Sequence, residues 1–227
     1  MGVETFTVSR QQGQVALARC KLYHVLSIAF QPPGPEKIHG VFDPEEGILS
    51  AYRKLQKYNP LLDAQEVFSE WPWYKTGSAE VDAEEVVCDY GRLFLGPGHI
   101  VAPPYESVYR DPKGWVMGEW AVEVRKIYEA SGLAIADSFK ELPDHIAAEL
   151  AFMAYLCDQE RCACDCGDLA TAQCALETQA DFLDNHLSRW VPQFCDKIVA
   201  NASTPLYRSL ARLLRQFIEL EMVQVAR

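Results

Sequence analysis

The sequence predicts an all-α protein, and three observations carry that prediction. In most segments the apolar residues recur at steps of three and four, as they do on the buried face of a helix. Prolines, glycines and polar residues separate these segments, at places where helices would end. No segment shows the alternation of a half-buried strand, and we find no internal repeat. We therefore expect one domain over residues 1–227, a helical bundle of roughly eight to ten helices.

The first half of the chain predicts four helices. Apolar stripes place three of them at residues 11–30, 49–58 and 61–68. A fourth pattern covers residues 86–94, and the carboxylates of Asp82 and Glu85 favour the positive end of a helix dipole there. Three of these patterns run into residues that stop a helix: Pro32-Pro33-Gly34-Pro35, Asn59-Pro60 and Gly96-Pro97-Gly98.

The second half predicts four more helices. One ends at the cap residue Gly132, and the next opens at Glu141-Leu142-Pro143-Asp144. Apolar residues then step by four and three from Leu176 to Trp190, and we expect Pro192 to end that helix. Thr204-Pro205 begins the last one, because proline suits the first position of a helix.

Charge and composition exclude several classes of protein. The formal net charge of -11 argues against a nucleic-acid partner, which needs a basic surface, and is compatible with a cationic one. No apolar run reaches the ~18 residues that a membrane span needs, and the first ten residues lack the pattern of a secretory signal. Eight cysteines in such a chain are expected to be reduced thiols. We therefore expect a soluble, cytoplasmic protein without membrane insertion.

The stretch from Tyr90 to Tyr109 carries the strongest functional signal of the residues themselves. After the glycine-proline bend it holds two prolines, two tyrosines and the carboxylate of Glu106 within a few positions. A solvated linker rarely gathers aromatic residues so densely, so we expect this loop to be packed and functional. It contains neither a phosphate-binding glycine loop nor a nucleophile elbow. The residues therefore favour a peptide-binding cleft over a catalytic one.

A second aromatic group, Glu70-Trp71-Pro72-Trp73-Tyr74, stands in an expected loop. Two interpretations are open. The group is either a plug in the core or part of a binding surface, since Trp and Tyr commonly anchor interfaces.

His145 and Glu149 have the chemistry of a catalytic or metal site. They are one helical turn apart, a spacing that suits a general acid/base pair or half of a metal site. Di-metal helix bundles need a second such pair, which we do not find in the sequence. The alternative places Asp144 in the first turn of a helix, against its dipole, with His145 bonded to a nearby loop.

Cys162, Cys164 and Cys166 form a further candidate metal site. Thiolates bind zinc and iron-sulfur clusters, but the usual ligands are separated by two or more residues. On a helix, a spacing of two points the sulfurs to different sides. A thiol-rich loop between two helices is the alternative, and the sequence leaves metal binding here open.

Two long motifs are more specific than any of these patterns. One is Leu93-Phe94-x-Gly96-Pro97 followed by Pro103-Pro104-Tyr105-Glu106-Ser107-Val108-Tyr109, and the other is Pro143-Asp144-His145-Ile146 followed by Glu149-Leu150-x-Phe152-Met153. Leu22-Tyr23-x-Val25-Leu26-Ser27 and Phe182-Leu183-x-x-His186-Leu187-x-x-Trp190-x-Pro192-x-Phe194 accompany them. Together they make the chain, from about Arg19 to Phe194, resemble the TorD/DmsD/NarJ-type redox-enzyme maturation chaperones.

This resemblance implies an all-helical cytoplasmic chaperone, TorD-like in fold, that is not an enzyme and carries no cofactor. Such proteins bind the twin-arginine signal peptide of a molybdopterin-dependent oxidoreductase, typically of the DMSO or TMAO reductase type. They hold the apo-enzyme until its molybdenum cofactor is inserted, and they prevent premature export. The implied partners are therefore the signal peptide and the apo form of the catalytic subunit.

The resemblance also implies where the peptide binds. The family's binding residues correspond to the Asp-His motif and the Gly-Pro loop, together with aromatic residues of the preceding segment. The candidate peptide-binding residues are accordingly Asp144, His145, Gly96, Pro97, Tyr105, Glu106, Ser107, Trp71 and Trp73.

Physical chemistry agrees with such a partner. Carboxylates such as Asp144 and Glu106 take the guanidinium groups of two arginines bidentately, and an aromatic groove buries an apolar helical segment. Our hypothesis is that the Gly96 loop and the Asp144 turn line one cleft.

Two alternatives stay open. The first is an assembly chaperone of the nitrate-reductase (NarJ-like) branch, and the second is a metal- or thiol-dependent enzyme that uses the Cys162–Cys166 run. Some members of the resembled family bind guanine nucleotides or exchange domains, so the sequence leaves open whether the chain is a monomer or a domain-swapped dimer.

Overall fold

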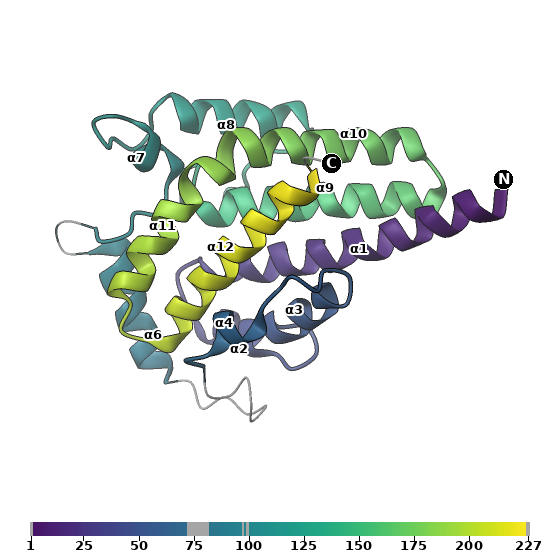
Figure 1. Ribbon diagram of the computed structural model, residues 1–227. Helices are drawn as coiled ribbons and strands as arrows, with labels where there is room; N and C mark the ends of the chain where they lie inside the picture. Colours follow the sequence, from purple (N-terminus) through teal and green to yellow (C-terminus); the bar gives the residue numbers. More distant parts are fainter. Residues whose placement is uncertain (1, 72–81, 97, 99, 226–227) are drawn as a thin grey trace.

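The structure is a computed structural model that describes residues 2–71, 82–96, 98 and 100–225 (Figure 1). Within these ranges the chain folds into helices and contains no β-strand. The prediction of an all-α fold is therefore confirmed. None of the described helices has both the length and the apolarity needed to cross a membrane.

The N-terminal half opens with a helix of 28 residues, α1, which is followed by shorter helices. The helices of this half are α1 (Gly2–Ala29), α2 (Pro35–Phe42), α3 (Ile48–Gln56), α4 (Ala64–Phe68), α6 (Ala83–Tyr90), the π-helical turn η1 (Gly91–Leu95) and α7 (Glu106–Arg110).

The C-terminal half contains long helices, two of which are separated by a second π-helical turn. They are α8 (Glu119–Ala130), α9 (Ile146–Cys166), α10 (Leu169–Phe182), η2 (Leu183–Leu187), α11 (Ser188–Asn201) and α12 (Pro205–Val225).

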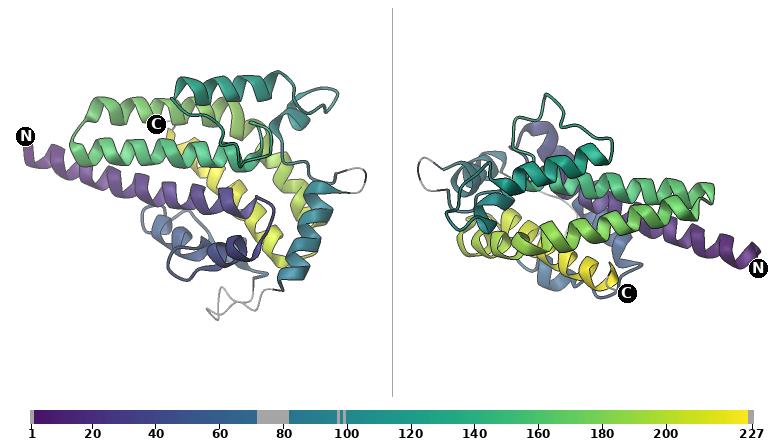
Figure 2. Two further views of the ribbon diagram at one scale, coloured as in Figure 1. Left: turned by 180° about the vertical axis from the view of Figure 1, so that it is seen from behind. Right: turned by 90° about the horizontal axis from the view of Figure 1, so that it is seen from above.

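Helices α1 and α9 lie side by side in the middle of the bundle and run antiparallel (Figures 1 and 2). Near one end, a Cβ atom added to Gly13 would lie 3.3 Å from the Cβ of Cys164. Near the other end, the hydroxyl of Ser27 donates a hydrogen bond of 2.7 Å to the carbonyl of Ala147. Small residues at these points let the two backbones approach closely.

A buried arginine and two buried glutamates form an ion-pair network between the two central helices and α12. The guanidinium of Arg19 in α1 donates to Glu160 of α9 (3.1 Å) and to Glu221 of α12 (2.7 Å). The hydroxyl of Tyr23 donates a further bond to Glu221. All three charged side chains are almost completely buried, and together they connect α1, α9 and α12 within the core.

Asp89 makes the corresponding link between α6 and the start of α12. Its carboxylate accepts hydrogen bonds from the backbone N–H groups of Ser203 and Thr204 and from the Thr204 hydroxyl, at 2.7–3.1 Å. Burial acts to raise the pKa of Asp89, but these donors outweigh it and lower the pKa to about 2.

The other helices cover this centre on several sides. α10 packs along α9, while α2, α3 and α4 lie beyond α1, and α11 and α12 cross the bundle obliquely (Figures 1 and 2). One large apolar core runs through all of them, from Leu22 of α1 to Ile218 of α12. The prediction of a single domain over residues 1–227 stays a prediction.

The expectation that Pro192 ends a helix is wrong. Pro192 lies inside α11, five residues after the end of the π-helical turn η2. Pro192 has no N–H to donate to the carbonyl of Ser188, so α11 lacks one hydrogen bond, but the burial of Trp190, Val191 and Phe194 keeps the helix continuous to Asn201. The apolar stripe from Leu176 to Trp190 is therefore divided among α10, η2 and α11.

Several predicted helix bounds are also wrong. The first helix begins at Gly2, well before Gln11. The third begins at Ala64 and not at Leu61, because the carboxylate of Asp63 caps it by accepting two backbone N–H groups. Two short helices, α2 and α7, have too few apolar residues for the three-and-four pattern to reveal them.

Candidate peptide-binding site

A short corner, made by residues 104–106 and 144–146, joins the starts of α7 and α9. The two segments meet in one antiparallel β-bridge, and backbone N–H···O bonds of 3.0 and 2.9 Å close it on either side. The corner therefore brings together the two long motifs of the sequence, which lie about forty positions apart in the chain.

Asp144 and His145 use their side chains to hold the two helices of this corner. One carboxylate oxygen of Asp144 accepts the backbone N–H of Ser107 in the first turn of α7 (2.9 Å). His145 is the N-cap of α9, where its Nδ1 accepts the N–H of Ala147 (3.1 Å). Burial lowers the pKa of His145 to about 3 and raises the pKa of Asp144, so the imidazole is neutral.

Glu106 ties the corner to the C-terminal half of the chain. Its two carboxylate oxygens contact the guanidinium of Arg110 (2.6 Å) and the Nδ1 of His186 (2.9 Å). The Arg110 guanidinium also lies over the ring of Trp120, 3.4 Å from its centre. Glu106 is fully buried, whereas the Arg110 side chain is 19% exposed and reaches the corner from the surface.

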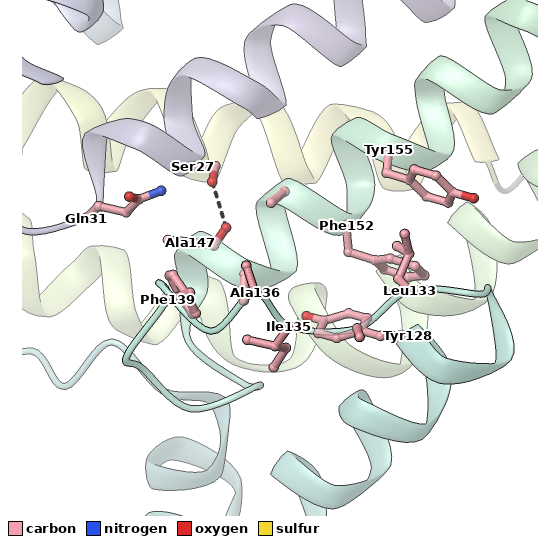
Figure 3. Close-up of a pocket in the computed structure, with 13 residues that line it drawn as sticks. Ser27, Gln31, Tyr128, Leu133, Ile135, Ala136, Phe139, Ala147, Phe152 and Tyr155 are labelled. Carbon is pink, nitrogen blue, oxygen red and sulfur yellow. Dashed lines mark hydrogen bonds between the residues drawn. The ribbon is translucent and has the colours of Figure 1, made fainter. Parts of the chain in front are cut away.

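Next to the corner lies an apolar groove with a volume of about 350 Å³ (Figure 3). This volume lies near the lower end of the ~300–1,000 Å³ of ligand pockets, so the groove has room for a few apolar side chains. One wall is the loop between α8 and α9, and the floor is the first two turns of α9. The lining residues are Ser27, Gln31, Tyr128, Leu133, Ala134, Ile135, Ala136, Phe139, Ala147, Ala148, Ala151, Phe152 and Tyr155.

The groove and the corner share structural elements. Ala147 and Ala148 lie two and three positions after the cap residue His145, and the ring of Phe139 lies edge-on to the His145 imidazole at 5.9 Å between centres. On the same loop, Asp137 is exposed and Glu141 is half-buried, where its carboxylate accepts the Tyr105 hydroxyl (2.5 Å). Carboxylates and apolar surface are therefore neighbours at this place.

Four of the candidate peptide-binding residues lie in the corner or directly next to it and are inaccessible in this conformation. Asp144, His145, Glu106 and Ser107 are each at most 1% exposed. Their polar groups hold α7, α9 and η2 together, as described above. The groove and the loop beside these residues are accessible in this conformation, and of the corner residues only Tyr105 is half-buried.

The remaining candidate residues are spread over other places. Gly96 ends η1 with a φ of 51°, a conformation that favours glycine, and it does not line the groove. Trp71 is buried against the rings of Phe42 and Phe68, in agreement with the core interpretation. Pro97 and Trp73 lie outside the described residues. The hypothesis that the Gly96 loop and the Asp144 turn line one cleft stays a prediction.

The cysteine run is helical, which corrects the expectation of a thiol-rich loop. Cys162, Cys164 and Cys166 occupy the last turns of α9, with Cys164 packed against α1 and Cys166 exposed. Since positions two apart point to different sides of a helix, the three sulfurs diverge. Within the described ranges, no three His, Cys, Asp or Glu side chains are placed to share a metal ion.

None of the residues that line the groove is among the candidate binding residues of the sequence analysis. Its floor is Ala147, Ala148 and Ala151, three small residues on the half of α9 next to the Asp-His motif. Small residues at helical spacing signal a close approach by another chain segment, but they occur equally where two helices of one protein meet. The loop from Leu133 to Phe139 has no motif that would have marked it.

Comparison with known proteins identifies the family. A model of the family described as nitrate reductase delta subunit matches residues 49–196, more than half of the chain. The chain therefore belongs to this family.

Its relatives include redox-enzyme chaperones of several kinds. It is 34% identical over 135 residues to the chaperone protein TorD of Vibrio cholerae, a match that spans 60% of each chain. It is 28% identical over 154 residues to the Tat proofreading chaperone DmsD of Salmonella typhi, covering 68% of this chain and 67% of that one. A selenate reductase assembly chaperone of Thauera selenatis is 33% identical over 137 residues, which are 60% of this chain and 68% of the relative.

A solved structure has the same fold. The crystal structure described as a putative redox enzyme maturation protein from Archaeoglobus fulgidus superposes with a TM-score of 0.53 at 21% identity. The superposition covers 88% of this chain and 93% of the other, so the shared fold includes most of both molecules.

Proposed function

We propose that this protein is a cytoplasmic maturation chaperone, not an enzyme, that binds the twin-arginine signal peptide of a molybdopterin-dependent oxidoreductase of the DMSO or TMAO reductase type. It holds the apo form of the catalytic subunit while the cofactor is inserted and prevents its early export. The names of its relatives support the chaperone role. One of them, DmsD of Salmonella typhi, is described as a Tat proofreading chaperone, which supports a twin-arginine leader as the ligand.

One structural observation carries the proposal: an apolar groove lies beside a loop with accessible carboxylates. A twin-arginine leader consists of a cationic pair followed by an apolar, helix-prone segment. The groove takes two or three of the apolar side chains, and Asp137 and Glu141 on the adjacent loop take the guanidinium groups. The net charge of -11 favours the approach of such a cation.

In this proposal, Asp144 and His145 support the groove structurally and do not themselves contact the leader. Because they cap α7 and α9, they fix the floor of the groove at Ala147 and Ala148 and hold the wall at Phe139. Replacing both by alanine would leave the N–H groups of Ser107 and Ala147 without their acceptors, so it would weaken binding and stability together. A test of binding alone has to change the peptide or the exposed lining of the groove.

Isothermal titration calorimetry with synthetic leaders of the molybdoenzymes from the same genome tests the function. We expect saturable one-to-one binding to one of them. Replacing its two arginines by glutamine, or two leucines of its apolar segment by serine, is expected to weaken binding at least tenfold. A scrambled leader of the same composition is the control. Equal affinity for the scrambled peptide, or no binding to any of these leaders, would contradict the proposal.

A further inference from the structure

Glu149 is a buried carboxyl group without a cationic partner of its own. Its side chain is completely inaccessible, and one oxygen accepts the indole N–H of Trp190 (3.1 Å). The other oxygen has no hydrogen-bond partner among the described residues. An ionised carboxylate in such a place would lack the donors and the positive charge that it needs. Burial without a cationic partner therefore favours the protonated form of Glu149.

Two other carboxyl groups surround Glu149. Asp144 is bound to the N–H of Ser107 through one oxygen, and its second oxygen is also buried and without a described partner. Both oxygens of Glu106 are occupied by Arg110 and His186. Burial first, and the neighbouring Glu106 second, raise the pKa of Glu149 well above its usual value.

The corner and the adjacent Glu149 are therefore short of positive charge. Arg110 supplies one guanidinium for three carboxyl groups, and the imidazole of His186 is hydrogen-bonded to Glu106. The titratable and charged groups that face Glu149 from the elements packed against it are Glu106 and Arg110 of α7, Asp144 of the preceding loop, Tyr128 of α8 and, through Glu106, His186 of η2.

We propose that binding of the arginine-containing leader is linked to release of the proton that Glu149 holds in the free chaperone. The guanidinium groups that the leader places at Asp137 and Glu141, beside the corner, bring positive charge toward Glu149, so that Glu149 ionises and its proton passes to the buffer. Glu141 links the two places, since its carboxylate accepts the hydroxyl of Tyr105 in the corner. This inference rests on the proposed function and concerns the regulation of the same site.

In the free protein, the same proton makes folding depend on pH. The folded-state pKa of Glu149 is raised, so the folded chain holds one proton more than the unfolded chain between the ordinary Glu pKa of ~4.3 and the folded value. The stabilisation is complete below the unfolded pKa and is lost as the pH rises toward the folded pKa. The unfolding constant is expected to rise by up to about tenfold per pH unit in that window.

Calorimetry in two buffers of different ionisation enthalpy, phosphate and Tris at pH 7, counts the protons released when the leader binds. We expect close to one proton per leader for the wild type and none for Glu149→Gln, which keeps the acceptor for the Trp190 indole. Release of the same number of protons by Glu149→Gln, or equal heats in the two buffers for the wild type, would overturn the inference. Leader binding without proton release would leave the proposed function intact.

Infrared difference spectroscopy tests the proton release on the wild-type protein, without a variant. The carbonyl band of a protonated, buried carboxyl group is expected in the free protein and is expected to disappear when the leader is added. A band that persists in the saturated complex refutes the proton link, while failure of any leader to bind contradicts the proposed function itself.

Discussion

Ala151 offers a direct way to block the groove without disturbing the fold. It lies on the exposed side of α9 and lines the groove floor. Leucine has a high helix propensity, so Ala151→Leu is expected to leave the helix intact while its side chain fills part of the 350 Å³. Burial of one leucine-sized side chain stabilises a complex by ~1.5–3 kcal/mol. Excluding one such side chain of the leader should therefore weaken binding roughly 10- to 150-fold.

The assay is calorimetry with the leader that binds the wild type best, together with thermal unfolding of both proteins. Ala170→Leu is the matched control, because Ala170 is exposed on α10, outside the groove lining. We expect Ala170→Leu to bind like the wild type. An Ala151→Leu protein that unfolds at the wild-type temperature and binds the leader with unchanged affinity would show that the apolar segment binds elsewhere.

Three predictions concern stability. Arg19→Met leaves two buried carboxylates unpaired and should lower the free energy of unfolding in urea by ~3–5 kcal/mol, most of which returns when both partners are also changed to glutamine. Asp89→Ala should cost ~2–3 kcal/mol at pH 7, because three donors lose their acceptor. Since the pKa of Asp89 is lowered to about 2, this stabilisation is present above the unfolded pKa of ~3.9, and the difference from wild type should shrink as the pH falls toward 2 in acid titrations. Gly47→Ala puts a Cβ atom 2.4 Å from a backbone oxygen and should lower the melting temperature by several degrees, whereas Gly34→Ala, which meets nothing within 4 Å, should not.

The sequence predicted those parts of the fold that depend on local chemistry. The helix start at Asp82 is confirmed, since its carboxylate accepts the N–H groups of Glu84 and Glu85. Gly96 and Gly132 stand at helix ends with positive φ, as the cap pattern indicated. Such signals can be read from single positions because a cap involves residues within one turn.

The candidate site was harder to predict because it depends on contacts between distant segments. A motif shows which residues are special but not whether they point to a ligand or to another helix. Asp144 is an example: a carboxylate beside a histidine suggests a surface for cations, yet its oxygen caps α7 from 37 positions away. The proline at position 192 failed as a stop signal for a similar reason, because the burial of its neighbours Trp190, Val191 and Phe194 against other segments holds the helix together there.

The burial of Asp144 and His145 suggests a physical reason why the resembled family's binding motif includes two side chains that are inaccessible here. In the proposed mode of binding, side chains that cap two helices and shape the floor of the groove affect peptide binding without touching the peptide. Glu149, one turn further along α9, is buried with one oxygen unpartnered among the described residues, so we propose that it responds to the charge of the leader. The alanine floor would then select the apolar segment by shape, and the carboxylates of the adjacent loop would select the arginines by charge. A leader that lacks either feature should therefore lose affinity through a different contact, and the two losses should add when both features are removed.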